Sequence, residues 1–333
     1  MVHRLRALLL LSLALVGCTE SPAPASGLVA REGRFGTLRD LVLFERPPDQ
    51  GGPFFLDRFE VTRDDWAQYL GQPRASTPDA STDGFLPQSG IDLPAARAFA
   101  AWRFCRLPRG EEWVYAATGN QAYSWPWGDA AQTSRANTAE LRLGKPTPVG
   151  TFESGRRADG PYDLVGNLAE WTESVPGQWF VEDPPFGAIA SWPELLVLGP
   201  WKNARTPALS IWLVPGQALP PSWLVQSLSD RVPRLVVGSD FLSPMEQRTA
   251  MRMPHDSGSS LGVRLAADPL SVLTCLTESV VEAQPRELEL VRRFLLRPGH
   301  AAALRAPWQL LLQRTPDRGL TPVGRLLVEV LGT

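Results

Sequence analysis

The chain has 333 residues, of which 44% are hydrophobic and 20% are charged, and its net charge is −2. This composition is ordinary for a globular protein with one large domain or two small ones. Because no basic run occurs beyond the first six residues, we expect no nucleic-acid partner.

Residues 1–18 predict a lipoprotein signal peptide. Arg4 and Arg6 make a positive start, and the apolar run that follows is too short for a comfortable membrane span. The run ends at Leu15-Val16-Gly17-Cys18, which resembles the lipobox of bacterial lipoproteins and implies lipidation of the Cys18 thiol. Since threonine and not aspartate follows, this resemblance implies, in a host that has an outer membrane, an outer-membrane lipoprotein that faces the periplasm or the cell surface. The alternative is an ordinary signal peptide with a chance cysteine.

The predicted elements after the signal peptide are short. Residues 19–35 begin with a Ser-, Pro- and Ala-rich run that predicts a flexible tether. Strand-like residues occur at 41–44, and a turn at 51–53. Helices are predicted at 63–70 with Thr62 as N-cap, from Pro94 to about 104, and at 110–117. Residues 118–160 are mostly loop, which is long for a compact domain.

The loop at 159–173 is the most informative stretch of the sequence. Its residues Asp163, Gly166, Leu168 and Glu170 can present two carboxylates and two backbone carbonyls to one point. Oxygen donors of this kind suit a hard cation such as Ca²⁺. Spacing alone nevertheless favours an ordinary Asp/Gly loop over a metal site.

This loop resembles the G-L-Y-D-M-V-G-N-V-W-E-W-T signature of the formylglycine-generating enzyme family, also called the sulfatase-modifying-factor domain. Further motifs of the family follow in order within residues 36–268. They are Phe54–Thr62, Arg106-Leu107-Pro108 with Glu112–Ala117, Trp125–Asp129, Pro148-Val149-Gly150 and Gly262–Ala266. The resemblance implies an α+β fold of the elaborated C-type-lectin-like kind. Little regular secondary structure is expected, with loops held by bound ions and packed tryptophans.

The resemblance also implies one calcium site. It assigns Asp163 and Glu170 as carboxylate ligands, and Gly166 and Leu168 as carbonyl ligands. Asn137 and Thr138 match half of another calcium site of the family. Its acidic loop has no counterpart between Glu140 and Pro148, so we expect a single Ca²⁺.

Catalytic members of the family carry two cysteines that bind copper and activate O₂, and they convert a sulfatase cysteine into formylglycine. The corresponding residues 234–248 contain no cysteine here, and none occurs between Cys105 and Cys275. We therefore expect no catalytic residues and no copper. Met245 is a conceivable soft ligand, but methionine more often fills a core. A Cys105–Cys275 disulfide remains an alternative to two free thiols.

Two regions lie outside the resemblance. The insertion 176–233 contains five tryptophans, namely Trp179, Trp192, Trp201, Trp212 and Trp223. We expect them to pack the insertion onto the domain, because apolar residues are usually buried. The alternative is a recognition surface. Residues 270–333 have helical spacing and predict three or four short amphipathic helices. We expect these helices to pack within the chain, with docking of a partner as the alternative.

The sequence thus predicts a lipid-anchored, non-catalytic sulfatase-modifying-factor-like module of the cell envelope, a pseudoenzyme with a binding or structural role. The membrane is its expected partner through the lipid, together with an envelope protein or an extracellular ligand. The alternatives are a formylglycine-generating oxidoreductase that works without the usual cysteines and an assembly factor of an envelope machine.

Overall fold

A computed structural model describes residues 41–48, 51–72, 83–119, 123–158, 160–174, 196–200, 209–213, 234–248, 251–252, 260–278 and 284–333. The predicted signal peptide with Cys18, the predicted tether and most of the predicted insertion lie outside these ranges. Within them, no helix has both the length and the apolar character that crossing a bilayer requires.

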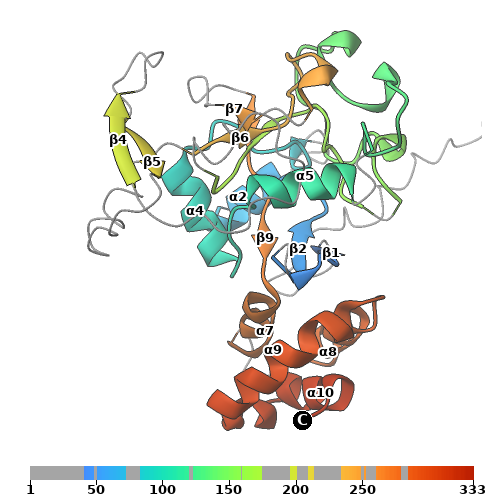
Figure 1. Cartoon of the computed structure of the whole chain (residues 1–333). Helices are drawn as coiled ribbons and strands as arrows, with labels where there is room; N and C mark the ends of the chain where they lie inside the picture. Colours follow the sequence, from blue (N-terminus) through green and yellow to red (C-terminus); the bar gives the residue numbers. More distant parts are fainter. Residues whose placement is uncertain are drawn as a thin grey trace, which may run out of the picture.

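Small sheets form the centre of the fold (Figure 1). One sheet has the order β1-β2-β9 and is antiparallel, with β1 at Leu41–Phe44, β2 at Phe54–Asp57 and β9 at Ala266–Ala267. The other has the order β7-β6-β3-β8, with β7 at Met251–Arg252, β6 at Val236–Val237, β3 at Ala169–Trp171 and β8 at Leu261–Gly262. Within it, β3 pairs with β8 in parallel and with β6 in antiparallel orientation. Strands β4 (Leu196–Pro200) and β5 (Leu209–Leu213) make a separate antiparallel pair.

Three helices cover the sheets, and all three predicted helices of this part are confirmed. Helix α2 (Arg63–Tyr69) begins with a capping box, in which Thr62 Oγ1 accepts from the Asp65 amide and Asp65 Oδ2 accepts from the Thr62 amide. Helix α4 (Leu93–Trp102) is capped by Asp92, whose side chain accepts from the Ala95 amide. At the start of helix α5 (Gly110–Thr118), the Glu112 carboxylate accepts a hydrogen bond from the Arg109 amide.

The stretch between α5 and β3 contains only short 3₁₀ turns in its described part. They are η3 (Thr133–Arg135), η4 (Ala139–Leu141) and η5 (Glu153–Gly155), and η6 (Met245–Gln247) lies later in the chain. Trp125 stacks on Trp127 with ring centroids 5.6 Å apart, and the Arg248 guanidinium lies 4.0 Å from the Trp125 ring centroid. The predicted loop-rich, tryptophan-held character of this stretch is confirmed.

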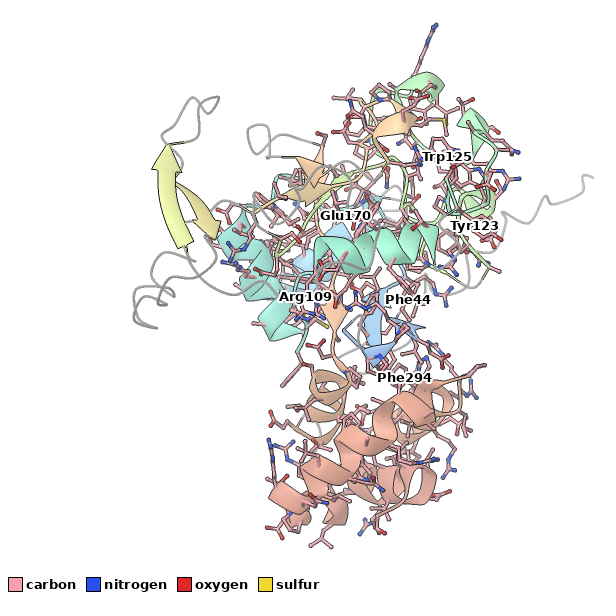
Figure 2. All side chains as sticks on the ribbon, in the orientation of Figure 1. Phe44, Arg109, Tyr123, Trp125, Glu170 and Phe294 are labelled. Carbon is pink, nitrogen blue, oxygen red and sulfur yellow. The ribbon has the colours of Figure 1, made fainter. Side chains whose placement is uncertain are left out.

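The C-terminal residues form α7 (Pro269–Glu278), α8 (Pro285–Leu295), α9 (His300–Arg314), η7 (Pro316–Leu320) and α10 (Pro322–Leu331). Figure 1 shows them as a layer at one end of the molecule, beside β1, β2 and β9. Phe294 lies where this layer meets the strands (Figure 2), with its ring 5.7 Å from that of Phe55. Leu41, Phe55 and Ala267 belong to the same hydrophobic cluster as the helices. The chain therefore has the predicted α+β fold, and its C-terminal helices share a core with a sheet.

Candidate functional site

A buried ion pair lies in the interior of the fold, beside α5 (Figure 2). Glu170 of β3 and Arg264 are both fully buried, and Arg264 Nη2 lies 2.8 Å from Glu170 Oε1. The Trp113 indole of α5 donates to Glu170 Oε2 at 2.5 Å. Arg264 also donates to the Asp57 and Tyr162 carbonyl oxygens, at 3.1 and 2.8 Å. Arg264 is thus a hub of buried hydrogen bonds.

Two further carboxylates lie near this pair. Glu60 accepts from the Asn167 side chain at 2.6 Å and from the Leu168 amide at 2.9 Å. Its pKa is raised well above the ordinary value by burial and by the charges of Asp163 and Glu170. Burial likewise raises the pKa of Asp163 to about 6, although the Gly150 amide, which donates to it at 2.8 Å, opposes the change. Three buried carboxylates therefore face one buried guanidinium, a balance that favours a bound proton or cation.

The backbone of the predicted calcium loop turns tightly at two residues. Asp163 and Gly166 have φ angles of 55° and 78°. At Gly166, a Cβ atom would lie 2.1 Å from the Asn137 carbonyl oxygen, so only glycine fits. The Gly166 amide donates to Ser239 Oγ at 2.9 Å, which ties the loop to the segment after β6.

The donor set of this loop is partly engaged by the protein itself. Both carboxylate oxygens of Glu170 accept from Arg264, and Asp163 Oδ2 accepts from an amide. Across the described ranges, no group of three or more His, Cys, Asp or Glu side chains is arranged to hold a metal ion. Calcium binding by Asp163, Gly166, Leu168 and Glu170 therefore stays a prediction, supported by the excess of buried negative charge.

A neighbouring polar cluster holds the loop that follows Glu140. The Asn137 side-chain amide donates to the Lys145 carbonyl oxygen at 3.0 Å and to Asn167 Oδ1 at 3.2 Å. Thr147 also donates to Asn167 Oδ1, through its amide at 2.9 Å. Asn137 Oδ1 is buried without a hydrogen-bond partner. Residues after Glu140 thus fold directly onto Asn137.

Residues 234–248, where catalytic relatives would carry their cysteines, make structural contacts here. The Phe241 amide donates to the Asn167 carbonyl oxygen at 3.1 Å. Asp240 Oδ1 accepts from the Leu242 amide and the Ser243 hydroxyl, at 2.9 and 2.8 Å. Met245 is buried with Trp125, so it fills a core as expected.

The two cysteines of the described ranges are free thiols, so the alternative of a Cys105–Cys275 disulfide is wrong. Cys105 follows α4 and its thiol donates to the Arg103 carbonyl oxygen at 3.3 Å. Cys275 is buried on α7.

Comparison with known families decides the membership of the chain. The model of the sulfatase-modifying factor enzyme 1-like domain matches residues 45–269. The chain belongs to this family. The family resemblance predicted from the motifs is therefore confirmed for this sulfatase-modifying-factor-like protein.

Its curated relatives differ in activity. It is 40% identical over 100 residues to the inactive C-alpha-formylglycine-generating enzyme 2 of Bos taurus, a match that covers 27% of this chain and 33% of the relative. It is 34% identical over 116 residues to the formylglycine-generating enzyme of Mycobacterium tuberculosis, a match that covers 32% of this chain and 39% of the relative. It is 38% identical over 99 residues to the hercynine oxygenase of Mycolicibacterium thermoresistibile, a match that covers 28% of this chain and 22% of the relative. The chain thus spans about two fifths or less of the length of these relatives.

Solved structures show weaker similarity to the sulfatase-modifying-factor-like protein. The Treponema denticola variable protein 1 aligns with a TM-score of 0.44 at 16% identity, covering 65% of this chain and 84% of that chain. CarF aligns with a TM-score of 0.39, also at 16% identity, covering 65% of this chain and 86% of CarF. Neither similarity bears on function.

Two residues of the buried centre escaped the sequence analysis as site residues. Glu60 belongs to the Glu-Val-Thr motif, and Trp113 to the motif that follows Arg106-Leu107-Pro108. The run that contains Glu60 also contains Asp57 and Arg58, so its charge alone did not single it out. Its partner Asn167 lies 107 residues further along the chain, so only the fold could identify the pairing.

Proposed function

We propose that this sulfatase-modifying-factor-like protein is a lipid-anchored, non-catalytic binding or structural module of the cell envelope. The observation that carries the non-catalytic part is the state of residues 234–248. They lack cysteine, and their side chains and amides serve the buried polar centre and the core. Similarity to the inactive C-alpha-formylglycine-generating enzyme 2 agrees with this proposal.

The remaining cysteines give no substitute for a copper-binding pair. Two thiolates on one metal must meet ligand identity, number and geometry together. Cys105 follows α4 and packs at the edge of two hydrophobic clusters, whereas Cys275 is buried on α7. Neither belongs to residues 234–248.

Copper binding tests the non-catalytic proposal. The purified full chain is titrated with Cu(I) against a competing chelator, beside its Cys105→Ser variant. We expect no stoichiometric uptake by either protein. Uptake of one Cu(I) per chain that the Cys105→Ser variant loses would overturn the proposal in favour of a formylglycine-generating oxidoreductase.

The lipid anchor rests on the lipobox-like Leu15-Val16-Gly17-Cys18. Expressed in a bacterial host, the Cys18→Ala variant should leave the membrane fraction or stall as an unprocessed precursor, whereas a Thr19→Ala control should behave as the native chain. Normal maturation and full membrane retention of the Cys18→Ala variant would rule out lipidation. An outer-membrane location would appear in a density-gradient separation of the two membranes.

A single Ca²⁺ at Asp163, Gly166, Leu168 and Glu170 is part of the same proposal. The carboxyl groups of Glu60, Asp163 and Glu170 outnumber the buried Arg264 guanidinium beside them, and a divalent cation would balance the charge of their ionised forms. The role of the ion would be structural, because a cation held by one loop fixes the loop against its neighbours.

A further inference from the structure

Helix α4 exposes an apolar surface. Its sequence Leu93–Trp102 contains one charged residue, Arg97, which is bound to Glu173 by two hydrogen bonds of 2.9 and 2.6 Å. Ala96, Phe99 and Ala100 face the core, yet Pro94, Ala98, Ala101 and Trp102 are exposed. A helix that is apolar on all sides is typical of a buried helix. The outer side of α4 therefore has the composition of a covered face.

Aromatic side chains extend this face onto α2, which lies beside α4 (Figure 1). The Tyr69 ring lies 5.5 Å from that of Trp102 and 5.4 Å from that of Trp66. Trp66 and Tyr69 are half-buried, Trp102 is 36% exposed, and Leu70, which follows Tyr69, is 51% exposed. We call the exposed residues of α4 together with Trp66, Tyr69 and Leu70 the α2–α4 face.

The predicted insertion leaves and rejoins the fold next to this face. The Leu235 amide donates to the Ser174 carbonyl oxygen at 2.8 Å, so the two ends of segment 175–233 are held together. Glu173 and Arg234 form an ion pair of 3.1 Å across the same ends, and Glu173 is also the partner of Arg97. With a rise of about 1.5 Å per residue, Trp102 lies only about 7.5 Å along the helix from Arg97.

We propose that the α2–α4 face is the docking surface for segment 175–233 of the same chain. Both ends of the segment lie beside Glu173, which is bound to Arg97 of α4. The segment is long enough to reach every residue of the face and contributes five of the twelve tryptophans of the protein. Segment 73–82, which lies outside the described residues and follows α2, is rich in Ser, Thr, Pro and Ala and carries no large apolar residue. Burial of aromatic surface on both partners would supply the driving force.

A photo-crosslinking experiment on the full chain tests the proposal. The photoreactive residue p-benzoyl-phenylalanine replaces Ala98 on the face or, as the control, Leu320 on η7, which is 72% exposed. We expect the probe at 98 to give an intramolecular crosslink to a peptide within 175–233, and the probe at 320 to give none there. A crosslink from 98 to a second copy of the chain, or to any region other than 175–233, would overturn the proposal.

Proteolysis gives an independent readout. Trypsin can cut segment 175–233 after Lys202, Arg205 and Arg231. Since cleavage tracks the population of the undocked segment, Trp102→Glu should accelerate these cuts about tenfold or more, while Leu320→Glu should not. Far-UV circular dichroism verifies that both variants fold, and Ala98→Glu repeats the test on an already exposed residue. Equal cleavage rates in the native chain and both face variants would contradict docking.

Discussion

Arg264 and Glu170 lie 94 residues apart in sequence and form a fully buried ion pair, with Nη2 and Oε1 separated by 2.8 Å. Arg264 also donates to the carbonyl oxygens of Asp57, at the end of β2, and of Tyr162, which precedes Asp163 in the predicted calcium loop. One guanidinium thus connects three segments that the sequence separates widely, and it supplies the positive charge to a centre with three carboxylates.

Arg264→Met should destabilise the protein severely. Removing one partner of a buried ion pair leaves an uncompensated charge and costs about 3–5 kcal/mol. In urea unfolding, Arg293→Met is the matched control, because the Arg293–Glu289 pair is exposed and its loss should cost about 0.5 kcal/mol or less. Similar losses for the two variants would refute the central role of Arg264.

Phe294→Ala should uncouple the C-terminal helices from the sheet. Its ring lies 5.7 Å from Phe55 and 4.6 Å from His300, at the junction of α8, α9 and β2. Truncating a buried phenylalanine costs about 3–5 kcal/mol. Leu296→Ala, two residues away and 66% exposed, should change the free energy of unfolding by less than about 0.5 kcal/mol. Chemical denaturation of the two variants measures the difference, and equal effects would show that the junction contributes little.

The stability of the protein should fall on acidification because of His300. Burial, together with the charge of Arg297, lowers the pKa of His300 to about 4 from an ordinary value of 6.5. The unfolded chain therefore binds a proton between these values while the folded chain does not, so stability is complete above pH 6.5 and declines towards pH 4. The decline from this residue is up to about 3 kcal/mol.

The variant His300→Phe isolates this contribution, since it keeps an aromatic ring between Phe55 and Phe294 and cannot titrate. Its free energy of unfolding, measured from pH 4 to 7, should approach or exceed that of the native chain as the pH falls. Parallel pH profiles for the two proteins would show that the His300 ring is not kept neutral by its surroundings.

Chelation of calcium should lower the melting temperature. A ligand that binds only the folded state stabilises it by about 2.7 kcal/mol at a concentration of 100 Kd. Asp163→Asn should abolish the difference between melting curves in Ca²⁺ and in EDTA, while Asp317→Asn on the exposed η7 should leave it intact. Identical curves for the native chain in both buffers would show that calcium does not stabilise the protein.

Local features of the fold were accessible from the sequence, because they depend on neighbouring residues. Thr62 and Pro94 predicted the starts of α2 and α4, and the structure has both helices there. The C-terminal helices were likewise predicted from apolar spacing. What the pattern could not provide was their shared core with Leu41 and Phe55, since helical periodicity identifies a buried face without naming what covers it.

The buried centre was likewise predictable only in part from the sequence. The motif that contains Glu170 was predicted as a site from its oxygen donors. The pairing of Glu170 with Arg264 and the proximity of Glu60 depend on the pairing of β3 with β8 and on hydrogen bonds from the Asp57 and Val61 amides to residues 263–265. The contacts of Glu60 with Asn167 and of Arg264 with Glu170 join residues that are 107 and 94 positions apart. Calcium binding by the predicted donor set stays a prediction, and only the fold could show that Arg264 binds its Glu170.

The most direct test of the account is an assay of formylglycine formation. The purified full chain is incubated with copper, oxygen and a cysteine peptide that carries a sulfatase motif, and the peptide mass is followed beside a Cys105→Ser variant. A non-catalytic protein leaves the peptide mass unchanged in both reactions. Conversion of the peptide thiol to the aldehyde by the native chain, lost in the Cys105→Ser variant, would contradict the account at its centre.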